Sequence, residues 1–223
     1  MLHATVRLVL VPLARLVYRP VIEGRENVPR SGPVILAANH LSFIDSVVIP
    51  LVAPRPVAFL AKAEYFQGRG VKGWLTRRFF TAIDAVPVER GTHRAAQASL
   101  EAARDVLARG GAFGIYPEGT RSRDGRLYRG RTGVAWLALT SGAPVVPVAV
   151  LGTDRIQPVG TRLPRIRRVT VRFGTPLHFA QPSSGTQRAA QARRVATDQV
   201  MDAIHALSGQ ERTADYNDLP AAA

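Results

Sequence analysis

The amino-acid sequence predicts a single α/β domain, in which a mostly parallel or mixed central sheet is flanked by helices and preceded by an N-terminal apolar and basic helical segment. The first observation is that short apolar runs, typical of buried strands, alternate along the chain with segments of helical periodicity. Such alternation is typical of sheets whose strands are joined by helical crossovers. The second observation is that 223 residues, 46% of them hydrophobic, suffice for one domain with a full core.

Each predicted strand is a short apolar run next to a turn signal. The first begins after Ser31-Gly32 and continues as PVILAAN. In the third, Pro87 indicates an edge or irregular position, because proline cannot donate a backbone hydrogen bond. The predicted strands are residues 33–39, 56–62, 84–90, 111–116, 144–152 and 169–177.

The predicted helices lie between these strands and after the last of them. The clearest has Thr92 as a suitable N-cap and Gly110 directly after its last turn. From Gln210 onwards the chain carries no comparable pattern, and we expect it to fray. The predicted helices are residues 46–53, 71–81, 92–109, 132–142 and 186–208.

The first 22 residues combine apolar side chains with arginines. Arg7, Arg15 and Arg19 share one side of a helical wheel. The apolar stretch between Arg7 and Arg15 is shorter than the roughly 20 residues that a spanning helix needs. A helix of this kind suits a bilayer interface, and docking on the protein's own core is the alternative. The predicted parts are a membrane-interface helix over residues 1–22, the α/β domain over 23–209 and a disordered tail over 210–223.

The net charge of +14 implies an anionic partner, which could be nucleic acid, a membrane surface or a phosphorylated substrate. The absence of cysteine excludes disulfides, zinc–thiolate sites and a cysteine nucleophile. The five histidines are scattered without metal-ligand spacing, and no G-x-S-x-G motif occurs. The segment GRGVKG, residues 68–73, matches G-x-G-x-x-G but follows no convincing strand, so we predict a loop there.

Three polar stretches each follow a predicted strand. They are NHLSFID at 39–45, VER at 88–90 and YPEGTRS at 116–122. The carboxyl ends of strands in an open α/β sheet collect the active site, so we expect these stretches to converge on one edge. His40 and Asp45 lie among apolar residues, where burial is costly unless the two satisfy each other. A purely structural histidine, capped by a nearby acid, is the alternative.

These stretches resemble the motifs of the glycerophospholipid acyltransferases, the family that includes the 1-acyl-sn-glycerol-3-phosphate acyltransferases. NHLSFID is similar to the family's N-H-x-x-x-x-D signature, and DAVPVERG at 84–91 to its second block. YPEGTRS resembles the third block, F-P-E-G-T-R-S, and VVPVAV at 145–150 the fourth. The ordered set spans roughly Gly24 to Thr175. Two positions depart from the pattern: Asp84 or Ala85 stands where glycine is common, and Tyr116 where phenylalanine is usual.

The resemblance implies transfer of an acyl group from a thioester, on coenzyme A or acyl carrier protein, to an alcohol, with no metal or other cofactor. Neutral imidazole can take the proton of a hydroxyl, so His40 would be the general base. Asp45 would accept a hydrogen bond from the other ring nitrogen and stabilise the imidazolium. Five residues are too many for one helix face, so we place Asp45 at the first turn of the helix beginning near Ser46.

The resemblance also implies a set of substrate-binding residues around the phosphate of the acceptor. Guanidinium groups match phosphate in a bidentate fork, and a glycine turn can present backbone N–H groups to an anion. For Glu118 two roles stay open: it orients Arg121, or it binds a glycerol hydroxyl. The expected substrate-binding residues are Lys62, Arg90, Glu118, Gly119, Thr120 and Arg121.

The expected function is therefore acylation of 1-acyl-glycerol-3-phosphate to phosphatidate by a peripheral protein on the cytoplasmic face of the cell membrane. The expected partners are acyl-CoA or acyl carrier protein, a lysophosphatidate-type lipid and an anionic membrane surface, but no nucleic acid. Arginines of residues 121–131 and 162–172 could face lipid head groups or the donor's phosphates. One alternative is a related acyltransferase for another lipid alcohol. Another is a basic nucleic-acid-binding protein, which a 7% aromatic content disfavours.

Overall fold

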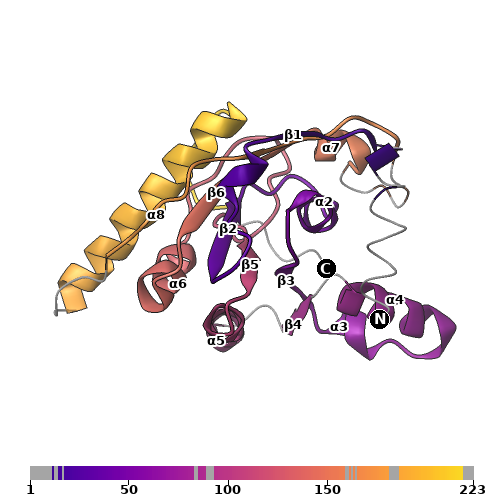
Figure 1. Ribbon diagram of the computed structural model, residues 1–223, viewed down its shortest axis with the longest axis horizontal. Coiled ribbons are helices and arrows are strands. Elements are labelled where there is room, and N and C mark those ends of the chain that lie inside the picture. Colours follow the sequence, from indigo (N-terminus) through magenta and orange to yellow (C-terminus); the bar gives the residue numbers. More distant parts are fainter. Residues whose placement is uncertain are drawn as a thin grey trace.

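The computed structural model shows a seven-stranded sheet with helices on both faces (Figure 1). This confirms the predicted fold class. The described residues are 12, 15, 16, 18–82, 85–88, 93–158, 161, 163, 165–180 and 186–217.

The strand order across the sheet is β1-β7-β6-β2-β5-β3-β4. Only β6 and β7 pair in antiparallel fashion within this sheet, while the other neighbouring strands are parallel. The sheet is therefore mixed and mostly parallel, as predicted. The strands are β1 (Val21–Glu23), β2 (Val34–Ala38), β3 (Val57–Lys62), β4 (Val86–Val88), β5 (Ala112–Ile115), β6 (Val145–Leu151) and β7 (Thr170–Phe173).

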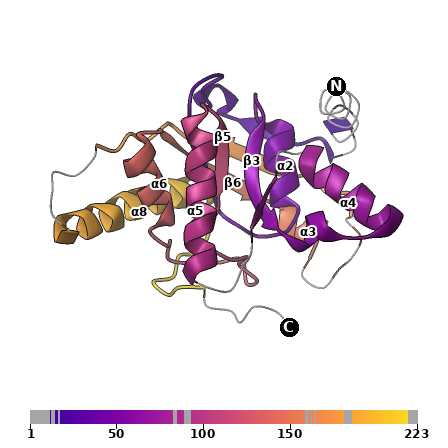
Figure 2. The same ribbon diagram turned by 90° about the horizontal axis from the view of Figure 1, so that it is seen from below.

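The helices form two layers and a hairpin at one end of the molecule. α5, α6 and α8 cover one face of the sheet, α2 covers the other, and α3 and α4 lie at the end opposite α8 (Figures 1 and 2). The helices are η1 (Arg25–Asn27), α2 (Asp45–Val52), α3 (Glu64–Gln67), α4 (Gly70–Ala82), α5 (His93–Ala108), α6 (Gly133–Ser141), α7 (Thr153–Ile156) and α8 (Thr186–Ser208).

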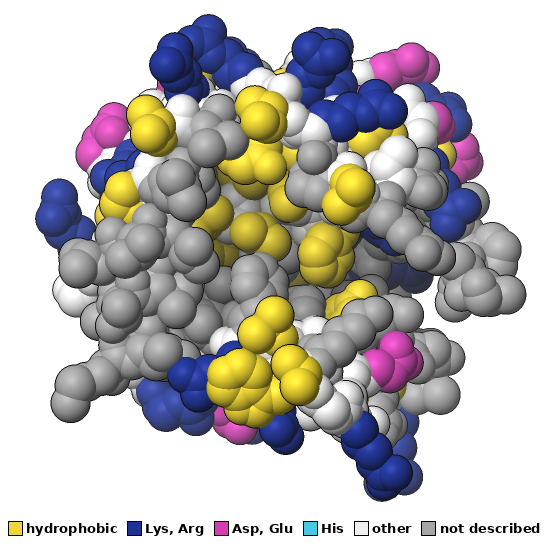
Figure 3. Space-filling view, turned by 90° about the vertical axis from the view of Figure 1, so that its right-hand side faces the viewer, with side chains coloured by type: hydrophobic (Ala, Val, Ile, Leu, Met, Phe, Trp, Pro, Cys, Tyr) yellow, Lys and Arg dark blue, Asp and Glu magenta, His cyan; other side chains and the backbone are white. Residues whose placement is uncertain are grey.

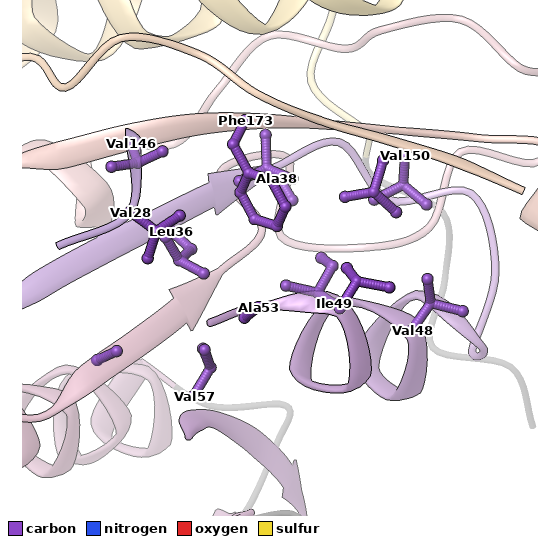
Figure 4. Close-up of a cluster of buried hydrophobic side chains, with 14 of the residues drawn as sticks. Val28, Leu36, Ala38, Val48, Ile49, Ala53, Val57, Val146, Val150 and Phe173 are labelled. Atoms are coloured by element: carbon purple, nitrogen blue, oxygen red, sulfur yellow. The ribbon is translucent and has the colours of Figure 1, made fainter. Parts of the chain in front are cut away.

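β2 lies near the middle of the sheet because all five of its side chains are apolar and buried. Successive side chains of a strand point to opposite faces. Leu36 and Ala38 accordingly pack with Ile49 of α2 in one core cluster, which Figure 4 shows. Ile35 and Ala37 belong to a second cluster with residues of α5, α6 and α8. Burial on both faces explains why the strand reads as a continuous apolar run.

The G-x-G-x-x-G segment is a helix contact. A Cβ on Gly73 would lie 2.1 Å from the carbonyl carbon of Gly68, so the two glycines let the backbones of α3's end and α4 touch. α4 begins at Gly70, so the predicted loop over residues 68–73 is wrong for its last four residues. Close packing of this pair accounts for both glycines without a bound nucleotide.

The ends of the predicted α/β domain differ from the sequence boundaries. Val21 and Ile22 form part of β1, which pairs with β7, so they belong to the sheet and not to the N-terminal helix. The expected disordered tail is wrong for residues 210–217. Glu211 accepts a backbone hydrogen bond from Leu127 at 2.8 Å, which ties the segment to the domain. Turn-rich sequence alone does not reveal such long-range pairing.

The N-terminal segment is described at a few positions. Pro12, Arg15, Leu16 and Tyr18 are helical, and most of the predicted helix over 1–22 lies outside the described residues. Arg15 Nη2 donates to the carbonyl of Leu51 in α2 at 3.3 Å. Across the part of the chain that the structure describes, no helix is both long enough and apolar enough to cross a bilayer.

Candidate active site

His40 and Asp45 meet at the carboxyl end of β2. The Nδ1 atom of His40 lies 2.8 Å from Oδ2 of Asp45. The Asp45 side chain is fully buried, while 14% of the His40 side chain remains exposed. Because a carboxylate only accepts hydrogen bonds, Nδ1 carries the hydrogen and Nε2 is left with its lone pair for a substrate.

The chain turns sharply between the two residues because Asp45 organises the loop. Its Oδ2 atom also accepts the backbone N–H groups of Leu41 at 2.7 Å and Ser42 at 2.8 Å. Asp45 is the first residue of α2, so the carboxylate lies at the positive end of the helix dipole. The predicted place of Asp45 in the first turn of this helix is therefore confirmed. The same carboxylate oxygen therefore holds both the backbone of the loop and the imidazole of His40.

Tyr116 forms the floor beneath the imidazole. Its ring stacks on His40 with the centroids 3.8 Å apart and the planes inclined by 8°. The Tyr116 hydroxyl is hydrogen-bonded to Oγ of Ser46 at 2.9 Å. Burial, with the negative charge of Asp45 adding to it, raises the pKa of Tyr116 well above its usual value. The phenol is therefore neutral at physiological pH and contributes packing and one hydroxyl.

Glu118 supports His40 from the turn that follows the neighbouring strand β5. The side chain is fully buried, and Oε1 accepts the backbone N–H of His40 at 3.0 Å. Oε2 accepts the backbone N–H of Tyr128, also at 3.0 Å. Burial raises the pKa of Glu118 from 4.5 to about 7, against the lowering effect of the two backbone hydrogen bonds. Both oxygens thus accept backbone N–H groups, a role that neither expectation for Glu118, orienting Arg121 or binding glycerol, included.

The turn after Glu118 lies beside the His40 loop. The backbone N–H of Ser122 donates to the carbonyl of His40 at 2.7 Å. Gly119 adopts φ +80°, which a glycine accepts without strain, and is exposed. Thr120 is half-buried and Arg121 is exposed. The predicted convergence of this stretch with His40 is therefore present, because β2 and β5 are parallel neighbours.

Arg131 is a further cation at this turn, and in the sequence it stands out only as one of the arginines of residues 121–131. A Cβ on Gly119 would lie 3.0 Å from Cδ and Nε of Arg131. The backbone N–H of Arg131 donates to the carbonyl of Pro117 at 2.7 Å. Its guanidinium carbon lies 5.4 Å from the ring centroid of Tyr216. Tyr216, near the end of the described chain, thus helps to hold Arg131 near the turn after Glu118, which could bind an anion.

Two predicted binding residues are not placed. Arg90 lies outside the described residues, as does Asp84. β4 ends at Val88 and runs parallel to β3, so the strand before Arg90 points to the edge that carries His40. The backbone of Lys62 ends β3, but its side chain lies outside the described part of the chain.

Asn39 is a supporting residue whose role the sequence did not reveal. The fully buried amide accepts the N–H of Val150 at 2.7 Å and donates to the carbonyl of the same residue at 2.9 Å. It also donates to Oε1 of Gln210 at 2.7 Å. Asn39 therefore joins the ends of β2 and β6 directly before His40. A polar residue at the end of an apolar run indicates a special role for Asn39. Its partner Val150 lies 111 residues away, and no local pattern in the sequence indicates that contact.

The arrangement can perform acid–base chemistry on a hydroxyl. It offers one imidazole nitrogen toward the substrate side, a buried carboxylate behind the ring and an exposed turn with two arginines nearby. Within the described ranges, no three His, Asp or Glu side chains come together as a metal site. The fold and site thus define an α/β protein with a His–Asp pair at the carboxyl edge of its sheet.

Comparison with known proteins names the family. Residues 19–151 match the family model described as Acyltransferase, and this chain belongs to that family. The match includes His40, Asp45 and the Glu118 turn, and ends with β6. The resemblance stated from the motifs is therefore confirmed.

Named relatives are consistent with this assignment. The chloroplastic 1-acyl-sn-glycerol-3-phosphate acyltransferase BAT2 of Brassica napus is 33% identical over 145 residues, which are 65% of this chain and 40% of that protein. The 1-acyl-sn-glycerol-3-phosphate acyltransferase of Limnanthes douglasii is 32% identical over 160 residues, 70% of this chain and 54% of that protein. This chain thus spans about half or less of the length of these two relatives.

A solved structure shares the fold. It is the 1-acyl-sn-glycerophosphate acyltransferase PlsC from Thermotoga maritima, with a TM-score of 0.61 and 25% sequence identity. The likeness covers 89% of this chain and 81% of that protein. The similarity therefore extends over more of the chain than the family model does.

Proposed function

We propose that this protein transfers a fatty acyl group from a thioester donor to the free hydroxyl of 1-acyl-glycerol-3-phosphate, giving phosphatidate. The observation that carries the proposal is the 2.8 Å pairing of His40 and Asp45 beside the Glu118–Arg121 turn. Membership of the Acyltransferase family supports it, as do the names of the relatives. The donor is acyl-CoA or acyl carrier protein, and the chain's net charge of +14 suits either one, because both are anionic.

In the proposed reaction His40 acts as the general base. The acceptor hydroxyl donates its proton to Nε2 while its oxygen forms a bond to the thioester carbonyl carbon. Asp45 holds Nδ1–H and stabilises the imidazolium that results. The tetrahedral intermediate then collapses, the carbon–sulfur bond breaks and the thiolate leaves. The imidazolium returns its proton to the thiolate, so the enzyme ends in its starting state.

The phosphate of the acceptor would bind at the turn after Glu118. The exposed Arg121 lies there, and Arg131 lies against Gly119. Guanidinium groups bind phosphate oxygens in pairs, and an exposed glycine turn adds backbone N–H groups. Arg90 and Lys62 remain further candidate phosphate ligands by their family motifs.

An apolar cavity beside α2 offers space for part of an acyl chain. Its volume is about 210 Å³, and one of its lining residues is Ile44, which directly precedes Asp45. A lipid chain would be desolvated there close to the reacting groups. The cavity is lined by Arg15, Tyr18, Pro20, Ile44, Val47, Val48, Leu51, Val52, Ile156 and Val169. A lipid acceptor also favours peripheral attachment to the cytoplasmic face of the cell membrane, where both donors occur.

The test supplies lysophosphatidate with acyl-CoA, or in parallel with acyl carrier protein, and follows thiol release. We expect turnover with one donor at least, and formation of phosphatidate by mass spectrometry. His40→Ala should abolish release with unchanged circular dichroism, while the matched control His178→Ala, at an exposed histidine, should keep it. Turnover of another lipid alcohol, but not of lysophosphatidate, would show that 1-acyl-glycerol-3-phosphate is not the acceptor and would favour the related acyltransferase. Salt-dependent DNA binding without any acyl transfer would favour the nucleic-acid alternative.

A further inference from the structure

Helix α4 turns its large apolar side chains toward solvent. Val71, Trp74 and Leu75 are spaced as neighbours on one helix face, and their exposed fractions are 81%, 48% and 61%. Surface helices of globular proteins normally turn this stripe toward the core. Gly73 of the same helix is buried against Gly68, in the turn between α3 and α4. α4 therefore exposes three large apolar side chains on one face, which indicates a partner.

The charged residues of α4 itself are all positive. α4 contains no acidic residue, and Arg77 and Arg78 are exposed. The guanidinium carbon of Arg78 lies 5.0 Å from the ring centroid of Trp74. A tryptophan next to arginines is the combination found at the interface of a bilayer, where the indole sits among head groups and the cations meet phosphates.

A second exposed apolar pair lies on the same side of the molecule. Leu163 is 81% exposed and Ile166 70% exposed, and the arginines on either side of Ile166 are exposed as well. Arg165 donates its N–H to the carbonyl of Ile156 in α7, which places this segment beside α7. α4 and α7 both lie at the right of Figure 1. Figure 3 views that side and shows hydrophobic side chains around a hollow, with many Lys and Arg and a few Asp and Glu side chains farther out.

This face adjoins the loop that carries His40. Phe43 makes an edge-to-face contact with Tyr65 of α3, with the centroids 6.4 Å apart, and α3 packs on α4. On the other side, Oγ of Ser42 donates to the carbonyl of Gln157, directly after α7. The loop between His40 and Asp45 is thus held between the two exposed apolar segments. A lipid that enters from this face would arrive at the candidate active site.

We propose that α4 is a lipid-contact element that inserts Val71, Trp74 and Leu75 into the head-group boundary of an anionic bilayer. Arg77 and Arg78 then contact lipid phosphates. This proposal deepens the proposed function, since it specifies how the protein sits on the membrane, but it needs no acyl transfer. A second copy of the chain is the less suitable partner, because pairing two α4 faces would bring like charges together in a protein of net charge +14.

Tryptophan fluorescence tests the insertion directly. The chain has two tryptophans, Trp74 and Trp136. In Trp136→Phe the remaining indole reports on α4 alone. On adding vesicles of 70% phosphatidylcholine and 30% phosphatidylglycerol, we expect a blue shift and quenching by brominated acyl chains. In the control Trp74→Phe, Trp136 of α6 should show neither effect.

Vesicle co-sedimentation measures how much the apolar and the basic side chains of α4 contribute to membrane binding. Trp74→Ser/Leu75→Ser should weaken binding to the same vesicles at least about tenfold, because two apolar side chains no longer leave water. The control Val195→Ser removes a side chain that is 50% exposed on α8, at the other end of the molecule, and should bind like wild type. Arg77→Ser/Arg78→Ser should weaken binding about fivefold per charge on these vesicles and little on pure phosphatidylcholine.

The outcomes separate this proposal from the proposed function. Vesicle binding is measured without a donor, so a protein that transfers no acyl group still tests α4. Unchanged binding of the Trp74→Ser/Leu75→Ser variant would overturn the lipid-contact proposal while leaving acyl transfer to be assayed on dispersed lysophosphatidate. A blue shift of Trp74 without vesicles, rising with protein concentration and accompanied by dimers in sedimentation, would also overturn it in favour of self-association.

Discussion

The imidazole of His40 lies flat on the phenol ring of Tyr116, with a centroid separation of 3.8 Å. The two residues come from neighbouring parallel strands, since His40 follows β2 and Tyr116 follows β5. Asp45 fixes one edge of the imidazole and Tyr116 fixes its plane. Together they define where Nε2 points, which is the direction from which a hydroxyl must approach.

Two replacements of Tyr116 distinguish the contribution of its ring, which stacks on His40, from that of its hydroxyl, which is hydrogen-bonded to Ser46. In Tyr116→Phe the stack remains and the hydrogen bond to Ser46 is lost, so we expect a loss of about 1 kcal/mol in the free energy of unfolding and near-normal turnover. In Tyr116→Ala the imidazole loses its floor, so kcat should fall more than KM changes. Steady-state kinetics and urea unfolding of both variants give the comparison. Equal kcat in the two variants would show that the stack does not position His40.

Asp45→Asn tests the orientation of the imidazole. An asparagine cannot stabilise the imidazolium, and its amide group can present a hydrogen where Nδ1 now donates. We expect kcat to fall about 10²-fold to 10⁴-fold, by analogy with other His–carboxylate pairs. The contacts to Leu41 and Ser42 also weaken, so unfolding is measured alongside. A variant that folds and retains wild-type kcat would contradict the role of Asp45.

Glu118 makes stability depend on pH. Burial raises its pKa from 4.5 to about 7, so the folded state binds more protons than the unfolded state between these values. The stabilisation is fully present below pH 4.5 and is lost as the pH rises through about 7. It amounts to about 3 kcal/mol at most. Urea unfolding at pH 5 and pH 8 measures it.

The matched variant for this prediction is Glu118→Gln, which removes the titration. Its free energy of unfolding should be lower throughout, because an amide nitrogen cannot accept the N–H of His40 or Tyr128. Its decline from pH 5 to pH 8 should be smaller than that of wild type. Identical pH profiles would mean that Glu118 keeps an ordinary pKa in the folded protein.

Arg121→Ala tests the phosphate turn. We expect KM for lysophosphatidate to rise about tenfold or more, with a smaller change in kcat, because a charged hydrogen bond to the bound phosphate is lost. The control is Arg126→Ala, since Arg126 is already paired with Asp124 at 2.7 Å. An acceptor without a phosphate should be insensitive to the substitution. If both arginine variants raise KM equally, the loss of positive charge in this region explains the effect, and Arg121 has no specific role in binding the phosphate.

Much of the fold could be predicted from the sequence because its signals are local. Apolar runs and helical spacing located most of the strands and longer helices near their observed bounds. The short elements β1, η1, α3 and α7 were missed, since they combine few residues with no extended apolar run around them. The ordered motifs likewise located His40, Asp45 and the turn at 118–121. A pair five residues apart must meet through a turn, which chain geometry makes predictable.

The sequence by itself determined the class of fold and the residues that meet at the carboxyl edge of the sheet. Only the tertiary structure decided what supports them. Glu118 binds the backbone of His40, 78 residues earlier, because β2 and β5 are neighbours in the sheet. Asn39 binds β6, and α4 leaves Val71, Trp74 and Leu75 exposed. The physical reason is that residue patterns specify which way a side chain points locally, while strand order and packing specify what it meets.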